Sequence, residues 1–245
     1  AKLTVLIYIT AFHSAIALFD VRAEHYLTTL TIGSIYYLYN AYNTNKLKHI
    51  IAAAALAACA VMTKGIFILI TIAGGFVVFW LVTKQWKQFI NYKWWLFGVL
   101  SFVFIIPELY TLYVQFDMHP EKVVFGQTHV SGIRFFFFDS QFGRFLNNGP
   151  IKGKGDPFFF IHTILWAFLP WSIIFYTAAV RLFSKRKMFY NATQGIIFWS
   201  AALTFLIFSL SKFQLPHYII ILFPQFAMIS ADYLIEKEEC KKTYI

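Results

Sequence analysis

Charged residues are scarce in this chain. Asp, Glu, Lys and Arg make up 13% of its 245 residues and hydrophobic residues make up 59%, whereas an ordinary soluble domain carries about 25% charged residues. Several apolar stretches approach or exceed the roughly 17 to 25 residues that a helix needs to cross a bilayer. The sequence therefore predicts an integral membrane protein.

Cysteines and cofactor motifs are also nearly absent. Cys59 lies in an apolar run and Cys240 in the charged C-terminal tail, so we expect no disulfide and no cysteine metal cluster. A nucleotide-binding loop, a zinc motif and a nucleophile elbow are missing as well. We expect no cofactor and no metal site. An enzyme built this way would have to draw its donor substrate from the membrane.

The apolar runs are continuous and lack the alternation of a membrane barrel, which favours helices that satisfy their own backbone hydrogen bonds in lipid. We expect an all-α, polytopic transmembrane helix bundle of about eight crossings, with residues 1–245 forming a single transmembrane domain. The third and fourth crossings are separated only by Lys64 and Gly65, and one broken or re-entrant element is an alternative there. The expected crossings are residues 3–19, 25–42, 49–63, 66–83, 94–113, 157–180, 191–210 and 217–234.

Basic residues are concentrated in the short connections. Most of the Lys and Arg fall on one side of the membrane if every crossing exists, and the positive-inside rule predicts that this side, with the tail 235–245, is cytoplasmic. The other side holds the long loop of about residues 114–156 and nearly all isolated polar residues at span ends. We therefore expect a multi-pass protein of the inner (plasma) membrane with an extracytoplasmic active face. The net charge of +10 is attributed to topology and lipid headgroups, not to nucleic acid.

Residues 139–171 join a polar, glycine-rich, net basic loop directly to an apolar span. This junction predicts a polar site held at a membrane surface. Within it, Arg144 stands between Phe142 and Phe145, and its planar guanidinium suits bidentate binding of a phosphate. An ordinary interfacial arginine is the alternative interpretation.

Asp20, Arg22 and Glu24 form an acid–base–acid cluster between the first two crossings. A guanidinium between two carboxylates would hold both ionised and orient a phosphate or a sugar hydroxyl. A solvated turn whose charges neutralise one another is the alternative. Lys64, beside Gly65 on the same side, either meets a phosphate as a point charge or extends to the membrane interface.

The last crossing opens with a proline-containing stretch. Pro216 fits a first helical turn and Pro224 predicts a kink. His217 and Tyr218 then face the outer interface with Lys212 nearby, and the Tyr218 hydroxyl is a donor for an anionic oxygen. Anchoring in the aromatic belt of the membrane is the alternative.

Taken together, four stretches resemble the GT-C membrane glycosyltransferases of family 39 type. That group includes protein O-mannosyltransferase-like bacterial proteins and the aminoarabinose transferase that modifies lipid A. The resemblance covers most of the chain, and its last two stretches are the most specific. The stretches are DVRAEHYL, TKG, the unit from FGRFL to DPFFFIHTILWAFLPW, and SLSKFQLPHYIIILFPQFAMISADYL.

The resemblance implies an enzyme that takes a sugar from a polyprenyl-phosphate carrier. The acceptor is a lipid, glycan or protein. By position, Arg144 resembles the basic residue that holds the carrier phosphate, with Tyr218 as its hydrogen-bonding companion and Lys64 as a looser match. Asp20 or Glu24 resembles the second acidic, catalytic position, and Arg22, His217 and Lys212 are further candidates for the site.

The family's principal catalytic acid lies in the first extracytoplasmic loop, and this chain is expected to begin after that point. Without that segment we expect the general base to be missing and the remaining residues to be inactive. Two other classes stay open: a transporter or flippase for lipid-linked sugars, and a homologue that binds the carrier without turnover. Transporters usually place ionisable groups near the midplane and often have internal repeats, and this sequence shows neither feature.

Overall fold

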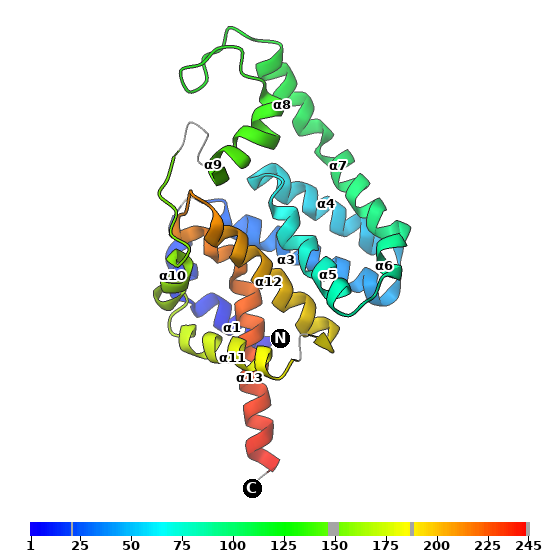
Figure 1. Ribbon diagram of the computed structural model, residues 1–245, viewed down its shortest axis with the longest axis vertical. Coiled ribbons are helices and arrows are strands. Elements are labelled where there is room, and N and C mark those ends of the chain that lie inside the picture. The colour runs from blue at the N-terminus through cyan, green and yellow to red at the C-terminus, as the bar shows by residue number, and fades with distance from the viewer. Residues whose placement is uncertain (21, 147–151, 187–188, 244–245) are drawn as a thin grey trace.

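The computed structural model describes residues 1–20, 22–146, 152–186 and 189–243; the side chains of Arg144 and of residues 240–243 lie outside this description. Across the described residues the regular elements are helical (Figure 1), and one isolated β-bridge joins Val124 to Gln127. The predicted all-α fold class is confirmed.

The helices pack as a bundle from which two elements extend. In Figure 1, α7 leads from α6 to the long loop at the top, and α13 projects beyond the bundle at the bottom. In chain order the elements are α1 (Lys2–Thr10), α2 (Phe12–Ala17), α3 (Glu24–Thr44), α4 (Leu47–Lys64), α5 (Ile68–Val82), α6 (Lys87–Ile90), α7 (Tyr92–Leu112), the π-helical turn η1 (Tyr113–Asp117), α8 (Gly132–Arg134), the π-helical turn η2 (Phe135–Asp139), α9 (Phe142–Leu146), α10 (Phe159–Ala167), α11 (Ser172–Ser184), α12 (Ala192–Leu210), the 3-10 helix η4 (Pro216–Leu222) and α13 (Phe223–Thr243).

The predicted crossings coincide with helical elements, and the chain is a membrane protein. Among the described residues, four helical segments are long and apolar enough to cross a bilayer: Leu47–Lys64, Tyr92–Asp117, Ala192–Leu210 and Pro216–Glu239. The number of eight crossings stays a prediction. Lys64 and Gly65 separate two helices, α4 and α5, because Gly65 adopts φ 100°, which ends α4.

Two predicted crossings are not continuous helices. The segment 3–19 breaks at Ala11, which has an extended backbone between α1 and α2, and the segment 157–180 breaks between α10 and α11. The breaks face each other, since the Phe12 N–H donates to the Leu169 carbonyl at 2.8 Å and the Trp171 indole N–H donates to the Thr10 hydroxyl at 2.8 Å. Each break thus provides hydrogen-bond partners for polar groups at the other break. Polar groups in an apolar surrounding need such partners.

The face of α4 that packs on its neighbours is rich in alanine. Small side chains let helix backbones approach closely, and Ser34 of α3 donates its hydroxyl to the Ala53 carbonyl at 2.9 Å. Because a connection of two residues joins α3 to α4, the helices run antiparallel and the start of α3 meets the end of α4. The alanines buried in this contact region are Ala53, Ala54, Ala57, Ala58 and Ala60.

A second close pair of helices, α5 and α12, packs at Gly75. A Cβ atom there would lie 2.5 Å from the Ile196 carbonyl oxygen, so only glycine admits the backbone of α12. Ser200 donates to the Thr71 carbonyl at 2.6 Å, and the hydroxyls of Thr204 and Thr71 are 3.1 Å apart. These polar contacts between helices fix the position of α12, which borders the cavity described next.

Candidate functional site

Glu24 and Lys64 form an ion pair where α3 begins and α4 ends. Lys64 Nζ lies 2.7 Å from Glu24 Oε1, and the Glu24 side chain is only 4% exposed. A carboxylate in the first turn of a helix and an ammonium in the last turn are both favoured by the helix dipole. The antiparallel packing of α3 and α4 therefore brings together two charges that are each favourable within their own helix.

The ion pair keeps Glu24 ionised. Glu24 precedes the predicted crossing of residues 25–42. Burial raises the pKa of its carboxyl, but the hydrogen bond and the positive charge of Lys64, with a contribution from His217, outweigh burial and leave the pKa below its ordinary value. At neutral pH the partly buried ammonium of Lys64 thus always has a counter-ion.

The 3-10 helix η4 covers the ion pair from the other side. Lys64 Nζ stands 4.2 Å from the centroid of the Tyr218 ring, a cation–π contact. His217 Nε2 lies 3.6 Å from Glu24 Oε1. Residues from α3, α4 and η4 therefore meet around one ammonium group.

Arg22 pairs differently from the sequence-based expectation. Its guanidinium bonds to the Asp20 carboxylate and to Nδ1 of His217, whereas Glu24 pairs with Lys64. The prediction of one guanidinium between two carboxylates was wrong. Glu24 opens α3 and is buried, while Asp20 lies in the preceding turn with 47% of its side chain exposed. Asp20, Arg22, His217, Glu24 and Lys64 nevertheless form one continuous chain of contacts.

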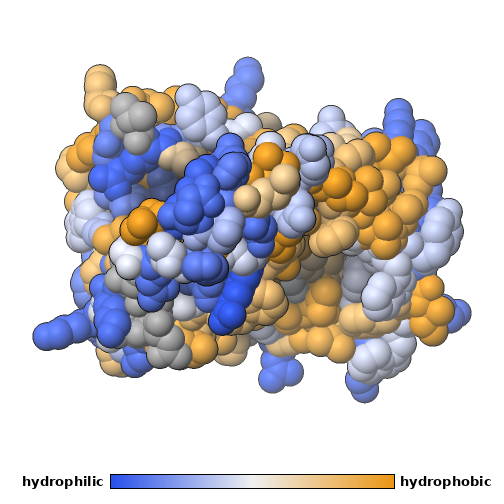
Figure 2. Space-filling model, turned by 90° about the horizontal axis from the view of Figure 1, so that it is seen from above, coloured by the Kyte–Doolittle hydropathy of each residue, from blue (hydrophilic) through white to orange (hydrophobic). Residues whose placement is uncertain are grey.

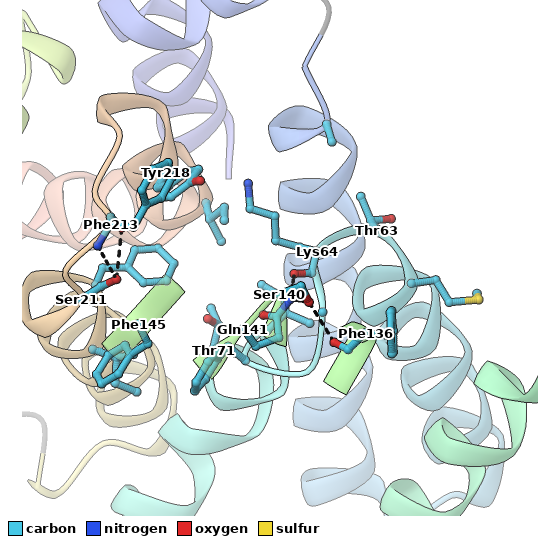
Figure 3. Close-up of a pocket in the computed structure, with 18 of the residues that line it drawn as sticks. Thr63, Lys64, Thr71, Phe136, Ser140, Gln141, Phe145, Ser211, Phe213 and Tyr218 are labelled. Carbon is cyan, nitrogen blue, oxygen red and sulfur yellow. Dashed lines mark hydrogen bonds between the residues drawn. The ribbon is translucent and has the colours of Figure 1, made fainter. Parts of the chain in front are cut away.

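A cavity of about 440 Å³ opens beside Lys64 and Tyr218. Figure 3 shows the Lys64 side chain extending toward Tyr218, with Phe145, Ser211 and Phe213 across from it. Its walls are largely aromatic and aliphatic, as is usual for sites that hold apolar ligands. The phenylalanines of the wall are Phe67, Phe136, Phe145, Phe160, Phe208 and Phe213.

The face that carries the long loop combines both kinds of surface. Hydrophilic residues gather over one part of this face, and hydrophobic side chains flank them (Figure 2). A ligand with a charged head and an apolar tail fits such a boundary better than a wholly polar molecule does.

The segments of Arg144 and Lys212 also border the cavity. Arg144 belongs to α9, and the next residue, Phe145, lines the cavity. The backbone N–H of Lys212 donates to the Phe145 carbonyl at 3.2 Å, and the Lys212 side chain is exposed. The guanidinium of Arg144 lies outside the described side chains, so the structure places its helix beside the cavity and leaves its contacts as a prediction.

Sequence reasoning missed Gln141. Its amide nitrogen donates to the Lys64 carbonyl at 3.1 Å and to the Ser140 hydroxyl at 3.1 Å. A Cβ on Gly65 would lie 2.1 Å from this nitrogen, so the glycine is what admits Gln141. Nothing in the sequence indicates that Gln141 is the group that approaches Gly65.

The site contains few groups for a metal ion. Across the described residues, no group of three or more His, Cys, Asp or Glu side chains is arranged to hold one. The charged groups of the site pair with one another instead, and their arrangement at the edge of an apolar cavity is suited to an anionic head group on an apolar chain.

The fold belongs to a known class of membrane protein. The structure resembles that of ArnT from Cupriavidus metallidurans bound to undecaprenyl phosphate, with a TM-score of 0.76 and 21% identity over 95% of this chain and 40% of that one. The apo state of the same protein gives a TM-score of 0.70 and 20% identity over 94% and 39%. The fold is thus that of ArnT.

A family comparison makes the assignment from sequence. Residues 2–124, half of the chain, match the dolichyl-phosphate-mannose-protein mannosyltransferase family, and the chain belongs to this family. An uncharacterized protein of Aquifex aeolicus (strain VF5) is 31% identical over 204 residues, which are 81% of this chain and 36% of that protein. The chain therefore spans well under half the length of these proteins. The resemblance to GT-C glycosyltransferases of family 39 type is confirmed.

Proposed function

We propose that this protein is part of a membrane glycosyltransferase that takes a sugar from a polyprenyl-phosphate carrier at the extracytoplasmic face of the plasma membrane. The observation that carries the proposal is the position of Lys64, held between Glu24 and Tyr218 at the edge of an apolar cavity. Family membership and the fold of ArnT, which was crystallised with undecaprenyl phosphate, support it.

The cation suits the departing phosphate. In the reaction, an acceptor oxygen bonds to the anomeric carbon, the bond from that carbon to the phosphate oxygen breaks, and the carrier phosphate leaves with the bonding electrons. Lys64 directs one ammonium hydrogen to Glu24 and has three to give, so another is available to a phosphate oxygen. We assign Arg144, from the neighbouring α9, to the same phosphate. Stabilising charge that develops on a leaving group is usually the largest single contribution to such catalysis.

The two carboxylates are suited to different tasks. Glu24 is buried against Lys64, which makes it a positioning residue for the ammonium. Asp20 is the more exposed acid, and it is our candidate in this chain for accepting the proton that the acceptor hydroxyl gives up. The acceptor is a lipid, glycan or protein.

The apolar cavity is assigned to the carrier chain. Aromatic side chains offer large apolar surfaces, and those of the cavity wall lie directly beside Lys64 and Tyr218. A phosphate at Lys64 would therefore allow the first isoprene units to enter the cavity. A transporter of lipid-linked sugars has less support, because the paired charges collect at one end of α3 and α4 and not at mid-length.

Lys64→Met in the full-length protein tests the proposal. The substitution keeps the side-chain length and removes the charge. We expect the rate of sugar transfer from a polyprenyl-phosphate sugar to fall by about 10²- to 10³-fold, the cost of losing one preorganised partner of the leaving group. Lys87→Met, an exposed lysine far from the cavity, is the matched control and should stay within about twofold of wild type. Unchanged transfer by Lys64→Met, assayed in the same vesicles, would refute the proposal.

A further inference from the structure

A polar cavity, distinct from the one beside Lys64, lies at the end of α3 opposite Glu24. It has a volume of about 230 Å³ and is bounded by the end of α3, the start of α4, α6 and the start of α7. The 21 residues of α3 separate it by about 31 Å from Glu24, at 1.5 Å per residue. Figure 1 shows α6 at the foot of α7, away from the long loop to which α7 leads. This cavity is therefore separate from the site around Lys64.

The cavity contains a buried lysine that has no counter-ion among the described residues. Lys93 is 8% exposed, and its ammonium donates to the backbone carbonyl and the side-chain oxygen of Asn45, which are both uncharged. Within the described part of the chain, no carboxylate lies within ion-pair distance of Lys93. The sequence explains why, since no Asp or Glu occurs between Glu24 and Glu108. A buried cation is costly unless an anion compensates it.

The amides around Lys93 present unused donors. The oxygen of Gln88 accepts from the Trp94 indole N–H at 3.0 Å, and the oxygen of Asn91 accepts from the Lys93 backbone N–H at 3.2 Å. These partners, like the Lys93 ammonium on Asn45, are donors only, so they fix which end of each amide is oxygen. Among the described residues, no acceptor is bonded to the side-chain NH₂ groups of Gln88, Asn91 and Asn45.

The cavity thus combines one cation with three amide donors, while its own amide oxygens are occupied. Capping of α3 explains the two hydrogen bonds from Lys93 to Asn45, and the Lys93 ammonium also lies 5.8 Å from the centroid of the Tyr92 ring. These contacts explain neither the open volume nor the three spare NH₂ groups. We propose that this cavity binds a phosphate-bearing anion, and that the anion is the phosphodiester headgroup of an acidic phospholipid. The inference does not depend on the proposed transfer reaction.

The surroundings of the cavity favour a lipid as the source of the phosphate. Trp86, Tyr92 and Trp95 are 57%, 64% and 70% exposed, and Ile90 between them is 83% exposed. Exposed tryptophan and tyrosine are typical of the headgroup level of a bilayer, where an acyl chain can pass along Ile90 while its phosphate enters the cavity.

Gln88→Glu and Asn45→Asp test the site. Each substitution keeps the oxygen that Trp94 or Lys93 uses and replaces the spare donor by a negatively charged oxygen. Asn45 has φ 58°, which aspartate also tolerates, and Asn45→Asp gives Lys93 a counter-ion, so this variant should fold even if Gln88→Glu does not. Lys87→Glu, an exposed residue on α6 with a larger change in charge, is the control.

The measurement is the dissociation constant of phosphatidylglycerol for the detergent-purified full-length protein, by native mass spectrometry. We expect Gln88→Glu and Asn45→Asp to raise it at least tenfold and Lys87→Glu to leave it within twofold. Inorganic phosphate is the second probe: failure to compete assigns the site to lipid, and competition at millimolar concentration supports the same anion site with free phosphate as its source. Wild-type affinity in both cavity variants, or an equal loss in Lys87→Glu, would overturn the inference.

Discussion

At the scale of single residues, the account depends on how one ammonium group is held. Lys64 receives its negative partner from α3, its aromatic partner from η4 and, at its backbone carbonyl, a hydrogen bond from Gln141. Three segments distant in sequence thus restrict its position. A cation fixed in this way needs little reorganisation when an anion arrives, which is the condition for effective electrostatic stabilisation.

Replacing Glu24 with Gln should destabilise the protein and weaken the site. The amide oxygen keeps a hydrogen bond to Lys64, so the change isolates the lost charge. Removing one partner of a buried pair costs about 3–5 kcal/mol, and since Lys64 is 30% exposed we expect about 1–3 kcal/mol, measured as a lower unfolding temperature in detergent. Glu121→Gln, at an exposed position in the long loop, is the control. Equal unfolding temperatures for both variants would mean that the Glu24–Lys64 pair carries no net stability.

The sequence indicated which residues form the site more reliably than how they pair. The structure brings together Glu24, Lys64, His217 and Tyr218, which the sequence singled out because ionisable or phenolic groups at the ends of apolar spans stand out. Their pairing depends on contacts across 40 to 195 residues, which a linear pattern does not contain. Gln141 was missed for the same reason, since an uncharged amide in a loop resembles any other.

At the scale of helices, hydropathy predicted where the apolar segments lie better than it predicted whether each segment is one continuous helix. The segments 3–19 and 157–180 are mostly apolar, yet each is divided into two helices whose breaks bond to each other. Hydropathy describes side chains and not the backbone. It therefore does not detect a helix break whose free backbone groups are hydrogen-bonded by another break. Pro170 in the second segment was the one local indication. Hydropathy also does not detect close helix contacts, such as that of α5 and α12 at Gly75, because these depend on the size of the side chains and not on their polarity.

Gly75→Ala and Gly98→Ala should have opposite effects on stability. The new Cβ on residue 75 would meet the backbone of α12 at 2.5 Å, whereas a Cβ on residue 98 of α7 would meet no atom of the described residues within 4 Å apart from its own helix backbone and chain neighbours. We expect Gly75→Ala to lose about 1–3 kcal/mol through overpacking, and Gly98→Ala to gain about 0.5–1 kcal/mol because alanine is the better helix former. Thermal unfolding of the two full-length variants decides this. Similar stability for the two would show that α5 and α12 can separate without cost.

At the scale of the whole molecule, the bundle has two chemically different ends. One end holds the Glu24–Lys64 pair and the long loop, and the other holds the Lys93 cavity and the lysine-rich connections. A segment of 83 residues between Glu24 and Glu108 carries lysines but no acid. By the positive-inside rule we expect the lysine-rich end to lie in the cytoplasm, which would put the candidate site on the outer face.

Cysteine labelling in intact cells tests this orientation. In a full-length protein with Cys59→Ala and Cys240→Ala, we expect Thr128→Cys in the long loop to react with a membrane-impermeant maleimide. Lys87→Cys, at the other end, should react only after the membrane is permeabilised. Both positions are exposed, so a difference reports sidedness. Labelling of Lys87→Cys in intact cells, with Thr128→Cys protected, would place the site in the cytoplasm.

The most direct measurement is a structure of the full-length protein with undecaprenyl phosphate bound. The account predicts the carrier phosphate within hydrogen-bonding distance of Lys64 Nζ and the first isoprene units against Phe145, Phe208 and Phe213. A carrier phosphate bound away from Lys64, with the cavity beside Tyr218 empty, would contradict it.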